Sequence, residues 1–346
     1  MKVKINGIKI SAISSCVPKA KLDLTSLSNQ FGEKEVRKII KTTGIKSVRV
    51  SENGVTTSDL CFISTKKIML DCNIKPDDID GLIFVSQTAD YKMPQTSHIL
   101  QNRLGLKKET ICFDLPVGCN GYIYGLFQAS LLIQSGSCNN VFVLCGDTTT
   151  KIINDQDRSL KMVFGDGGSS TLIEKGSQDI SFIIYSDGAK FKDLIIKSGG
   201  SRFPYSISDN EIITDEDGNS RSNSDLYMNG MAIFNFAITC VPKLIDEILE
   251  YSEWKKENID LFALHQANKF MIDYLRKKIK VNLNKMPVVV DGFGNTGPAT
   301  IPILLTEKIK NKNKTKVLLC GFGVGLSWGG ATCNLSKTKI IKTLEV

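Results

Sequence analysis

One cysteine of this chain occupies a position that favours nucleophilic chemistry. Cys119 stands in Gly-Cys-Asn-Gly, between a short strand expected at Ile111 to Asp114 and an apolar helical stretch that begins near Gly121. Free N–H groups and the helix dipole at a helix N-terminus favour a thiolate. The flanking glycines, Gly118 and Gly121, allow a tight turn and close approach of a substrate. Because the chain has ten cysteines, an ordinary buried thiol is the alternative interpretation of Cys119.

Two further polar residues follow expected strands or glycine turns. His265 comes directly after the apolar run Leu261 to Leu264, so it should project from the carboxyl end of a strand, where α/β proteins collect their ligands. Asn295 lies in Gly-Phe-Gly-Asn-Thr-Gly, where an asparagine is ordinarily a turn residue. A satisfied structural histidine is the alternative for His265. Only an internal repeat of the chain predicts that both residues lie near Cys119.

Two other glycine-rich segments resemble nucleotide-binding turns only superficially. Gly321 to Gly325 lies too near the end of the chain for the acidic residue that a dinucleotide site requires about twenty residues later. We expect it to approach another backbone closely and to offer an N–H group to a developing oxyanion. Phe164 to Gly168 lacks the Lys-Ser/Thr of a phosphate loop and is expected to form a hairpin between core strands.

The chain contains an internal repeat, with similar segments recurring after about half its length. The matching pairs are Gly118–Gly121 with Gly294–Gly297, Val143–Gly146 with Leu318–Gly321, and Asp80–Gln87 with Ile259–Gln266. Each half runs from an apolar strand through a glycine turn and a helix of about five turns to a second apolar strand. If the halves are related by an approximate twofold, the turns that carry Cys119 and Asn295 face each other across one cleft. A thiol, an imidazole and a carboxamide would then converge.

Alternating strands and helices predict an α/β fold with buried, mostly parallel sheets. We place the boundary between two domains after the strand Ser170 to Glu174, which gives halves 1–175 and 176–346. Pro287 to Val290 is expected to be a short strand. The polar stretch Ser206 to Asp225 is expected to be a mobile surface loop, and the alternating lysines from Lys308 to Lys316 a solvated helix end and loop.

Composition excludes several classes of protein. The chain is 42% hydrophobic and 23% charged, which is typical of globular proteins. Its 346 residues are too many for one small core. No apolar run approaches the ~18–20 residues of a membrane helix, and no secretory signal is apparent, so we expect a cytoplasmic protein. The cysteines contain no C-x-x-C and predict reduced thiols, with no metal and no cofactor. The net charge of +8 is mild and does not predict nucleic-acid binding.

Taken together, these motifs resemble 3-oxoacyl-acyl-carrier-protein synthase III, a branch of the thiolase superfamily. The resemblance spans nearly the whole chain in order. It implies a five-layered αβαβα thiolase-like fold built from two duplicated halves, usually as a homodimer. The segments that carry it are Gly118–Gly121, Phe164–Gly168, His265–Asn268, Gly294–Thr300 and Gly321–Gly330 with its Ser-Trp-Gly-Gly.

The resemblance implies a decarboxylating condensation. Cys119 would take an acyl group from a thioester donor, either acyl-coenzyme A or an acyl-carrier protein. His265 and Asn295 would hydrogen-bond the thioester carbonyl of malonyl-acyl-carrier protein and stabilise the enolate formed as carbon dioxide leaves. The oxyanion at the acyl group would meet the N–H groups of Cys119 and Val324, a position where the family commonly has glycine. A Cys-His-Asn set argues against elongating ketosynthases and thiolases proper.

Further residues are implied only by the same resemblance. Substrate contacts would come from Met93, Arg158, Gly230, Phe234, Asn268, Phe322 and Gly323, with Met93 reaching into the partner's acyl pocket. Carrier-protein docking would involve Lys269 and Phe270. The chain departs from the family at three positions besides Val324. Lys38 and Thr42 stand where a Trp and an Arg clamp the adenine of coenzyme A, and Phe270 replaces a carrier-docking arginine.

These departures leave acyl chain length, donor and pathway open. The leading hypothesis is a decarboxylating ketosynthase, which could serve a specialised pathway. One alternative keeps the acyl-Cys119 intermediate but passes the acyl group to a sugar, amine or hydroxyl acceptor without condensation. The other is a thiolase-fold binding protein whose cleft has lost its activity.

Overall fold

The computed structural model of the protein describes residues 1–310 and 315–346. The long strands are β1 (Lys2–Val17), β4 (Gly81–Val85), β5 (Ile111–Leu115), β6 (Asn140–Thr148), β7 (Asp166–Lys175), β8 (Gln178–Ser186), β13 (Leu261–Leu264), β14 (Lys316–Gly323) and β15 (Ser327–Asn334). The short ones are β2 (Lys21–Asp23), β3 (Ser47–Arg49), β9 (Leu194–Ile195), β10 (Ile213–Thr214), β11 (Ser220–Arg221), β12 (Tyr227–Met228), β16 (Lys339–Ile340) and β17 (Leu344–Glu345). The α-helices are α1 (Ser28–Phe31), α2 (Glu33–Thr43), α3 (Thr57–Cys72), α4 (Thr96–Leu104), α5 (Gly121–Gln134), α6 (Arg158–Lys161), α7 (Gly230–Tyr251), α8 (Lys269–Ile279) and α9 (Thr300–Lys308).

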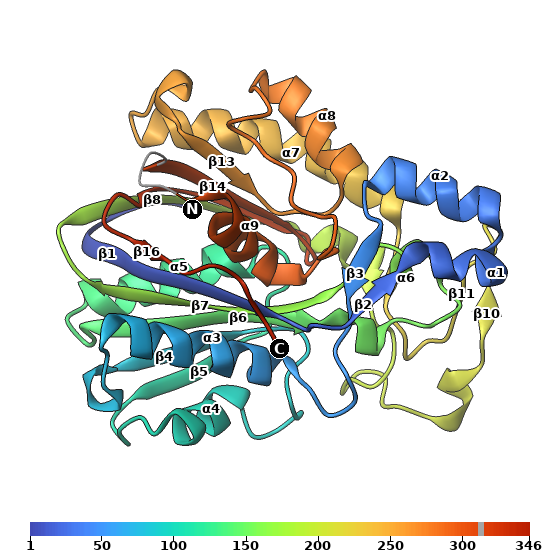
Figure 1. Ribbon diagram of the computed structural model, residues 1–346, viewed down its shortest axis with the longest axis horizontal. Helices are drawn as coiled ribbons and strands as arrows, with labels where there is room; N and C mark the ends of the chain where they lie inside the picture. The colour runs from blue at the N-terminus through green and yellow to red at the C-terminus, as the bar shows by residue number, and fades with distance from the viewer. Residues whose placement is uncertain (311–314) are drawn as a thin grey trace.

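A large mixed sheet organises these elements (Figure 1). Within the described residues it has 11 strands, and its main path runs β13-β14-β15-β8-β1-β7-β6-β4-β5, with β16 and β17 paired to β1. The long strand β1 lies in the middle of this path and joins its two halves, since its first residues pair with β8 and its later residues pair with β7. Parallel pairing occurs at the ends of the path, whereas the pairs along its middle are antiparallel. The expectation of mostly parallel sheets was therefore wrong.

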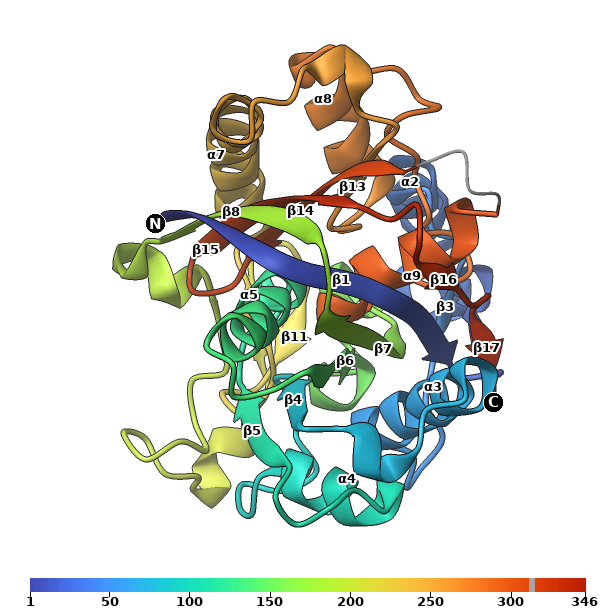
Figure 2. The same ribbon diagram turned by 90° about the vertical axis from the view of Figure 1, so that its left-hand side faces the viewer.

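The sheet curls so that the molecule has five layers (Figure 2). Helices α7 and α8 cover the outer face of the β13, β14, β15 and β8 end, and α3 and α4 cover the outer face of the β4 to β6 end. Helices α5 and α9 lie between the two ends and contact strands of both. The fold is thus the αβαβα arrangement that the resemblance implied.

The two central helices are apolar around their whole circumference, which is typical of a helix buried on all sides. In α9, every residue from Thr300 to Thr306 is buried. In α5, Gly125 leaves room for two core valines, because an added Cβ there would lie 2.6 Å from Val143 and 3.0 Å from Val85. These helices are shorter than the five turns expected, with 14 residues in α5 and 9 in α9.

Two other sequence predictions need correction. Pro287 to Val290 forms no strand; the Val289 amide donates instead to the side-chain Oε1 of Gln266, 2.8 Å away. The stretch Ser206 to Asp225 is partly ordered into a 3-10 turn and the β10–β11 hairpin. Arg221 in this hairpin donates to the fully buried carboxylate of Asp157 at 2.6 Å, which ties the segment to helix α6.

The remaining structural expectations concern cysteines, lysines and membrane spans. All ten cysteines are free thiols, six of them buried. Lys308 ends helix α9 and Lys316 begins β14, while Lys312 and Lys314 lie outside the described residues. Across the described part of the chain, no helix has the length and apolarity needed to cross a membrane. In the same residues, no cluster of three or more His, Cys, Asp or Glu side chains could hold a metal ion.

Candidate active site

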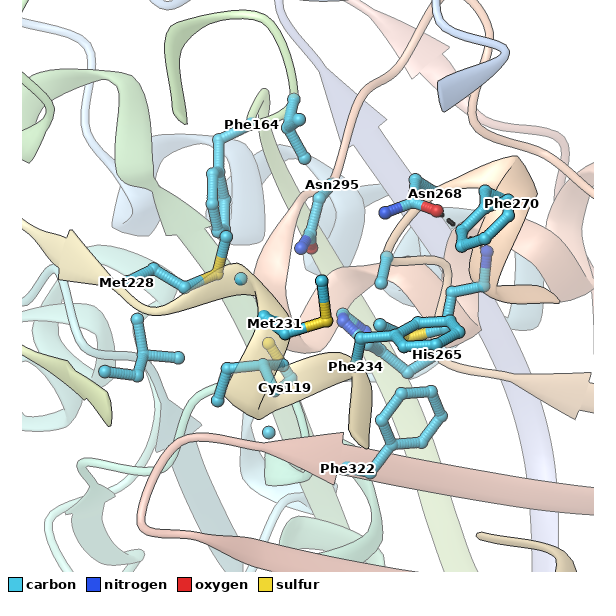
Figure 3. A pocket seen from close by; sticks show the side chains of 17 residues that line it. Cys119, Phe164, Met228, Met231, Phe234, His265, Asn268, Phe270, Asn295 and Phe322 are labelled. Atoms are coloured by element: carbon cyan, nitrogen blue, oxygen red, sulfur yellow. Dashed lines mark hydrogen bonds between the residues drawn. The ribbon is translucent and has the colours of Figure 1, made fainter. Parts of the chain in front are cut away.

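Cys119, His265 and Asn295 line one cavity of about 350 Å³ (Figure 3). Their side chains point into a common space from three different loops. The sequence repeat therefore predicted this convergence correctly. The cavity is lined by Cys119, Val163, Phe164, Leu194, Met228, Gly230, Met231, Ile233, Phe234, His265, Ala267, Asn268, Phe270, Met271, Asn295, Phe322 and Gly323.

Cys119 lies in the turn between β5 and α5, next to the helix cap residue Asn120. A glycine of β14 makes room for it, since an added Cβ on Gly323 would lie 2.8 Å from Cys119 Cβ and 3.2 Å from Sγ. Burial raises the pKa of the Cys119 thiol from 9.0 to about 12, and the nearby carboxylate of Asp147 adds to the rise. Desolvation thus acts against the thiolate that the helix N-terminus is expected to favour.

His265 follows β13 and is almost fully buried. Its backbone N–H donates to the carbonyl of Cys320, and its Nδ1 lies 2.7 Å from the hydroxyl of Thr300 in α9. The ring stands edge-on to Phe322, at 5.4 Å between centroids. Burial lowers the pKa of His265 from 6.5 to about 3, which a hydrogen bond with the Gly297 backbone opposes only in part. The imidazole is therefore neutral at physiological pH.

Asn295 is held by the backbone on both sides of its turn. Its N–H donates to Val163 and its carbonyl accepts from Gly165, so the turn runs beside Phe164. The side-chain Oδ1 accepts the N–H of Gly297 at 3.1 Å, which directs Nδ2 toward the cavity. The predicted hairpin at Phe164 to Gly168 was wrong, because Phe164 bridges Asn295 instead and the following residues begin β7.

The likeness of this chain to known proteins agrees with that geometry. Two family models described as 3-oxoacyl-[acyl-carrier-protein (ACP)] synthase III and its C-terminal part match residues 113–188 and 249–335. A Campylobacter jejuni relative is 35% identical over 356 aligned positions, which cover 100% of both chains. A beta-ketoacyl-[acyl-carrier-protein] synthase III of Lactococcus lactis is 34% identical over 94% of this chain and 99% of its own.

The crystal structure of a 3-oxoacyl-(acyl-carrier protein) synthase from Burkholderia xenovorans LB400 has the same fold. It matches with a TM-score of 0.94 and 35% identity, over 100% of this chain and 99% of that one. The chain belongs to the 3-oxoacyl-acyl-carrier-protein synthase III family. It is a condensing acyltransferase of the thiolase superfamily.

Most of the other residues that this family suggested are at the cavity. Gly230, Phe234, Asn268, Phe322, Gly323 and Phe270 all line it. Asn268 caps helix α8 by accepting the N–H of Met271 through Oδ1 at 2.9 Å, and its amide nitrogen faces the cavity (Figure 3). Phe234 stacks on Phe270 with ring centroids 5.3 Å apart.

Three of the suggested residues, and the two α2 positions where the chain departs from the family, lie away from the cavity wall. Met93 is 82% exposed, and the Arg158 guanidinium donates to the carbonyl of Asp217. Lys269 pairs with Asp273 one turn along α8. On helix α2, Lys38 pairs with Glu35 and the Thr42 hydroxyl donates to the carbonyl of Lys38. The chain thus has no aromatic residue at either of these α2 positions.

Sequence reasoning missed the apolar wall beyond Cys119. Val163, Leu194 and Met228 line the cavity there, and Met231 stands at its edge with 69% of its surface exposed. Leu194 and Met228 belong to β9 and β12, which pair with each other across a long insertion. Two-residue strands leave no periodic signal, so only the three-dimensional pairing brings these side chains to the cavity.

A buried carboxylate behind Cys119 was also missed. Oδ1 of Asp147 accepts the Ser86 hydroxyl at 2.9 Å, the Gln87 N–H at 2.8 Å and the Thr88 hydroxyl at 3.2 Å. Oδ2 faces Gly297, where an added Cβ would lie only 2.4 Å from it. Burial raises the pKa of Asp147 from 3.8 to about 7, against the lowering effect of these hydrogen bonds. Asp147 therefore links the end of β4 to the turn that carries Asn295.

Proposed function

We propose that this enzyme forms an acyl thioester on Cys119 and condenses it with malonyl-acyl-carrier protein, releasing carbon dioxide and a 3-oxoacyl thioester. The observation that carries the proposal is the common cavity of Cys119, His265 and Asn295. Its lining is otherwise mostly apolar, which suits a hydrocarbon acyl group and excludes water that would hydrolyse the thioester.

The first step is acyl transfer to Cys119. The sulfur attacks the carbonyl carbon of the donor thioester, forming a C–S bond while the donor's C–S bond breaks, and the Cys119 proton leaves with the donor thiol. The developing oxyanion lies within reach of the N–H groups of Cys119 and Val324. Within the described part of the chain, neither amide donates a hydrogen bond to another protein group. Both donors are therefore available to the substrate.

The second step uses His265 and Asn295. The Thr300 hydroxyl has one proton and two acceptors, the Gly297 carbonyl at 3.0 Å and His265 Nδ1 at 2.7 Å. When it donates to Nδ1, the ring proton sits on Nε2, which then donates into the cavity. Nε2–H and the Nδ2 group of Asn295 would hydrogen-bond the malonyl thioester carbonyl. The bond to the carboxylate breaks, carbon dioxide leaves, and the electron pair becomes an enolate stabilised by these two donors.

The enolate carbon then attacks the acyl carbonyl on Cys119. A carbon–carbon bond forms, the C–S bond to Cys119 breaks, and the negative charge that entered on the malonyl carboxylate ends on the sulfur. A proton from solvent restores the thiol. The pKa of about 12 for the resting thiol makes this proton uptake strongly favourable at neutral pH.

The donor would be an acyl-coenzyme A or an acyl-carrier protein, and the extender malonyl-acyl-carrier protein. An acidic carrier would dock beside the entrance, where Phe270 is exposed and Lys269 adjoins it. Exposed cations continue from there along α8 and onto α2, namely Lys277, Lys278, Lys34, Arg37 and Lys41. Such a basic surface attracts an acidic partner and speeds its association.

We also propose a homodimer. Large apolar side chains are exposed on two neighbouring segments, with Met93 at 82% and Ile207 at 86%. Lys92 links the segments by donating to the carbonyl of Gly199 at 2.8 Å. Exposed apolar groups of this size are typical of an interface. Met93→Asp with Ile207→Asp should give a monomer by light scattering, whereas Leu70→Asp, at a leucine of α3 that is 77% exposed, should not.

The same proposal covers the organisation and location of the chain. Residues 1–175 and 176–346 would be two duplicated halves, with the boundary in the short turn between β7 and β8. A cytoplasmic location is supported by the ten free thiols, which are typical of a reducing compartment.

The test of the function is carbon dioxide release from malonyl-acyl-carrier protein by the acylated enzyme. His265→Ala and Asn295→Ala should each lower that release by about 100-fold or more while Cys119 still accepts an acyl group. Acylation of a sugar, amine or hydroxyl acceptor without carbon dioxide would contradict the proposal and favour transfer without condensation.

A further inference from the structure

The turns that carry Cys119 and Asn295 touch each other through apolar atoms. An added Cβ on Gly121, two residues after Cys119, would lie 3.2 Å from the Cβ of Pro298, three residues after Asn295. A contact of this kind sets the separation of the two turns better than their orientation. Because reacting groups must be aligned as well as close, the site needs a further attachment between the turns.

Asp147 provides a contact on the Asn295 side. Its side chain lies against Gly297, where an added Cβ would be 2.4 Å from Oδ2 and 3.2 Å from both Cβ and Cγ of Asp147. The N–H of Gly297 donates to Oδ1 of Asn295 at 3.1 Å. The Gly297 carbonyl accepts the hydroxyl of Thr300, and that hydroxyl also contacts His265. A shift of Gly297 would therefore move the Asn295 carboxamide and, through Thr300, the His265 ring.

The other carboxylate oxygen of Asp147 fixes the segment that packs on the Cys119 turn. Oδ1 accepts the backbone N–H of Gln87 at 2.8 Å. The Gln87 side chain covers Gly118, where an added Cβ would lie 2.3 Å from its Oε1. Val324, a proposed oxyanion donor, contacts the same glycine, with Cγ1 2.7 Å from the added Cβ. Since Gly118 directly precedes Cys119, Asp147 holds the Cys119 turn through Gln87.

The burial of Asp147 is unfavourable for stability. The residue is 4% exposed, and its hydrogen-bond donors are neutral groups, the hydroxyls of Ser86 and Thr88 and the N–H of Gln87. Burying a carboxylate without a cationic partner destabilises the folded state. Burial raises the pKa of Asp147 to about 7, and carboxyl groups perturbed in this way are concentrated at functional sites.

We propose that Asp147 is a positioning residue that sets the orientation of Cys119 relative to Asn295 and His265. Asp147 does not line the cavity of these three residues, so it acts through their turns and not on the substrate. Its Oδ1 contacts affect acyl transfer, and its contact with Gly297 affects the condensation. The inference rests on the proposed function, because it concerns the geometry of the same three side chains.

The first experiment compares Asp147→Ala with Asp147→Asn in the two steps separately. Acyl transfer from acetyl-, butyryl- and hexanoyl-coenzyme A is followed by intact-protein mass, and carbon dioxide release by the pre-acylated enzyme in a single turnover with malonyl-acyl-carrier protein. Asp147→Ala should lower both rates by about tenfold or more, with the half-saturating carrier concentration changed by less than about twofold. Asp147→Asn keeps an acceptor oxygen and should restore both rates to within about threefold of the wild type.

Asp80 offers a matched control at the opposite end of the same two strands. It precedes β4, and its Oδ2 accepts the N–H groups of Asn139 and Asn140 at 2.8 and 3.2 Å where β6 begins. Asp147 lies near the other end of β6. Asp80→Ala thus removes a carboxylate that joins β4 to β6 far from the catalytic turns, and should change neither rate by more than about twofold.

Two further variants test the two contacts of Asp147 individually. Gln87→Ala keeps the backbone bond to Asp147 but exposes Gly118, and should slow acyl transfer more than carbon dioxide release. Gly297→Ala should slow carbon dioxide release by about tenfold or more, but by much less when it is introduced into Asp147→Ala, because Oδ2 is then absent. The backbone strain at Gly297 is the same in both backgrounds and cancels in this comparison. Near-ultraviolet circular dichroism checks that each variant folds.

The outcomes separate this inference from the proposed function. If Asp147→Ala keeps both rates, if Asp80→Ala loses as much, or if the effects of Gly297→Ala and Asp147→Ala simply multiply, the positioning role is overturned while the acyl-Cys119 chemistry stands. If the wild type takes no acyl group and releases no carbon dioxide, the proposed function fails and this inference fails with it.

Discussion

His265 Nδ1 lies 2.7 Å from the hydroxyl oxygen of Thr300, and both groups are buried. Thr300 comes from α9 and His265 from the end of β13, so this contact joins a central helix to the outer part of the sheet. The same hydroxyl reaches the carbonyl of Gly297, two residues beyond Asn295. The orientations of the two groups that would stabilise the enolate are therefore coupled through one threonine.

Thr300→Val should selectively damage the condensation step. Valine keeps the shape but removes the hydroxyl that contacts His265 Nδ1 and orients the ring, so carbon dioxide release should fall by about 10–100-fold. Acylation of Cys119 should change little, because that step uses other donors. Thr300→Ser keeps the hydroxyl and should retain most of the activity. Equal losses in both steps would indicate a general structural defect instead.

The rate of Cys119 alkylation should rise steadily with pH. Because its pKa is raised to about 12, the thiolate is scarce at neutral pH and increases tenfold with each pH unit. Iodoacetamide labelling followed by mass spectrometry should show no plateau between pH 7 and pH 9. The Cys119→Ala variant serves as the control, because its labelling measures the reaction of the half-buried Cys72, Cys112 and Cys240. A plateau in this range would mean that the helix N-terminus outweighs burial after all.

Gly323→Ala should prevent acylation without unfolding the protein. The added methyl would meet Cys119 Cβ at 2.8 Å and Sγ at 3.2 Å, so the sulfur must move away from its oxyanion donors. We expect the acylation rate to fall by about 100-fold, as for loss of an oxyanion donor. Gly188→Ala is a surface control, since Gly188 is exposed, its φ lies outside the left-handed region and no atom lies within 4 Å of an added Cβ there. Unchanged acylation in Gly323→Ala would contradict the close packing of β14 on Cys119.

Asp147 should make the protein less stable as pH rises toward neutrality. Its pKa is about 7 in the folded protein against 3.8 in the reference state, so between these values the folded state binds more protons than the unfolded state. The free energy of unfolding therefore falls through this window, by up to about 4 kcal/mol from this group. Asp147→Asn keeps an oxygen acceptor but does not titrate, and should lose less stability between pH 5 and pH 8 in urea titrations.

His265 changes the free energy of unfolding with pH in the opposite direction to Asp147. Its pKa is lowered to about 3, so between that value and 6.5 the unfolded state binds more protons and stability rises with pH. This contribution is common to the wild type and Asp147→Asn, and the difference between the two proteins isolates Asp147. If the stability of the wild type and of Asp147→Asn depended equally on pH, the raised pKa of Asp147 would be refuted.

The sequence predicted the elements that carry the site better than their pairing. The strand Leu261–Leu264 and the turn of Cys119 were predicted at the observed positions, because an apolar run and flanking glycines act locally. The direction of strand pairing depends on contacts distant in the chain, above all those of β1, and was wrong. Pro287 to Val290 had a strand pattern, but its backbone bonds to the Gln266 side chain.

Electrostatic properties were the least predictable from the sequence. The position of Cys119 before a helix indicated a stabilised thiolate, but burial by side chains of distant elements raises its pKa. Asp147 lies near the end of strand β6 and has no distinctive motif around it, so its proximity to Gly297 emerges only from the folded chain. Desolvation depends on everything packed around a group, which no local pattern encodes.

The most direct test of the central claim is the intact mass of the protein before and after malonyl-acyl-carrier protein is added to the acylated enzyme. The wild type should gain the mass of one acyl group from its thioester donor and lose it on addition, with carbon dioxide and a 3-oxoacyl thioester appearing in equal amounts. Cys119→Ala should gain nothing. An adduct that persists in Cys119→Ala, or one that malonyl-acyl-carrier protein fails to discharge, would contradict the account.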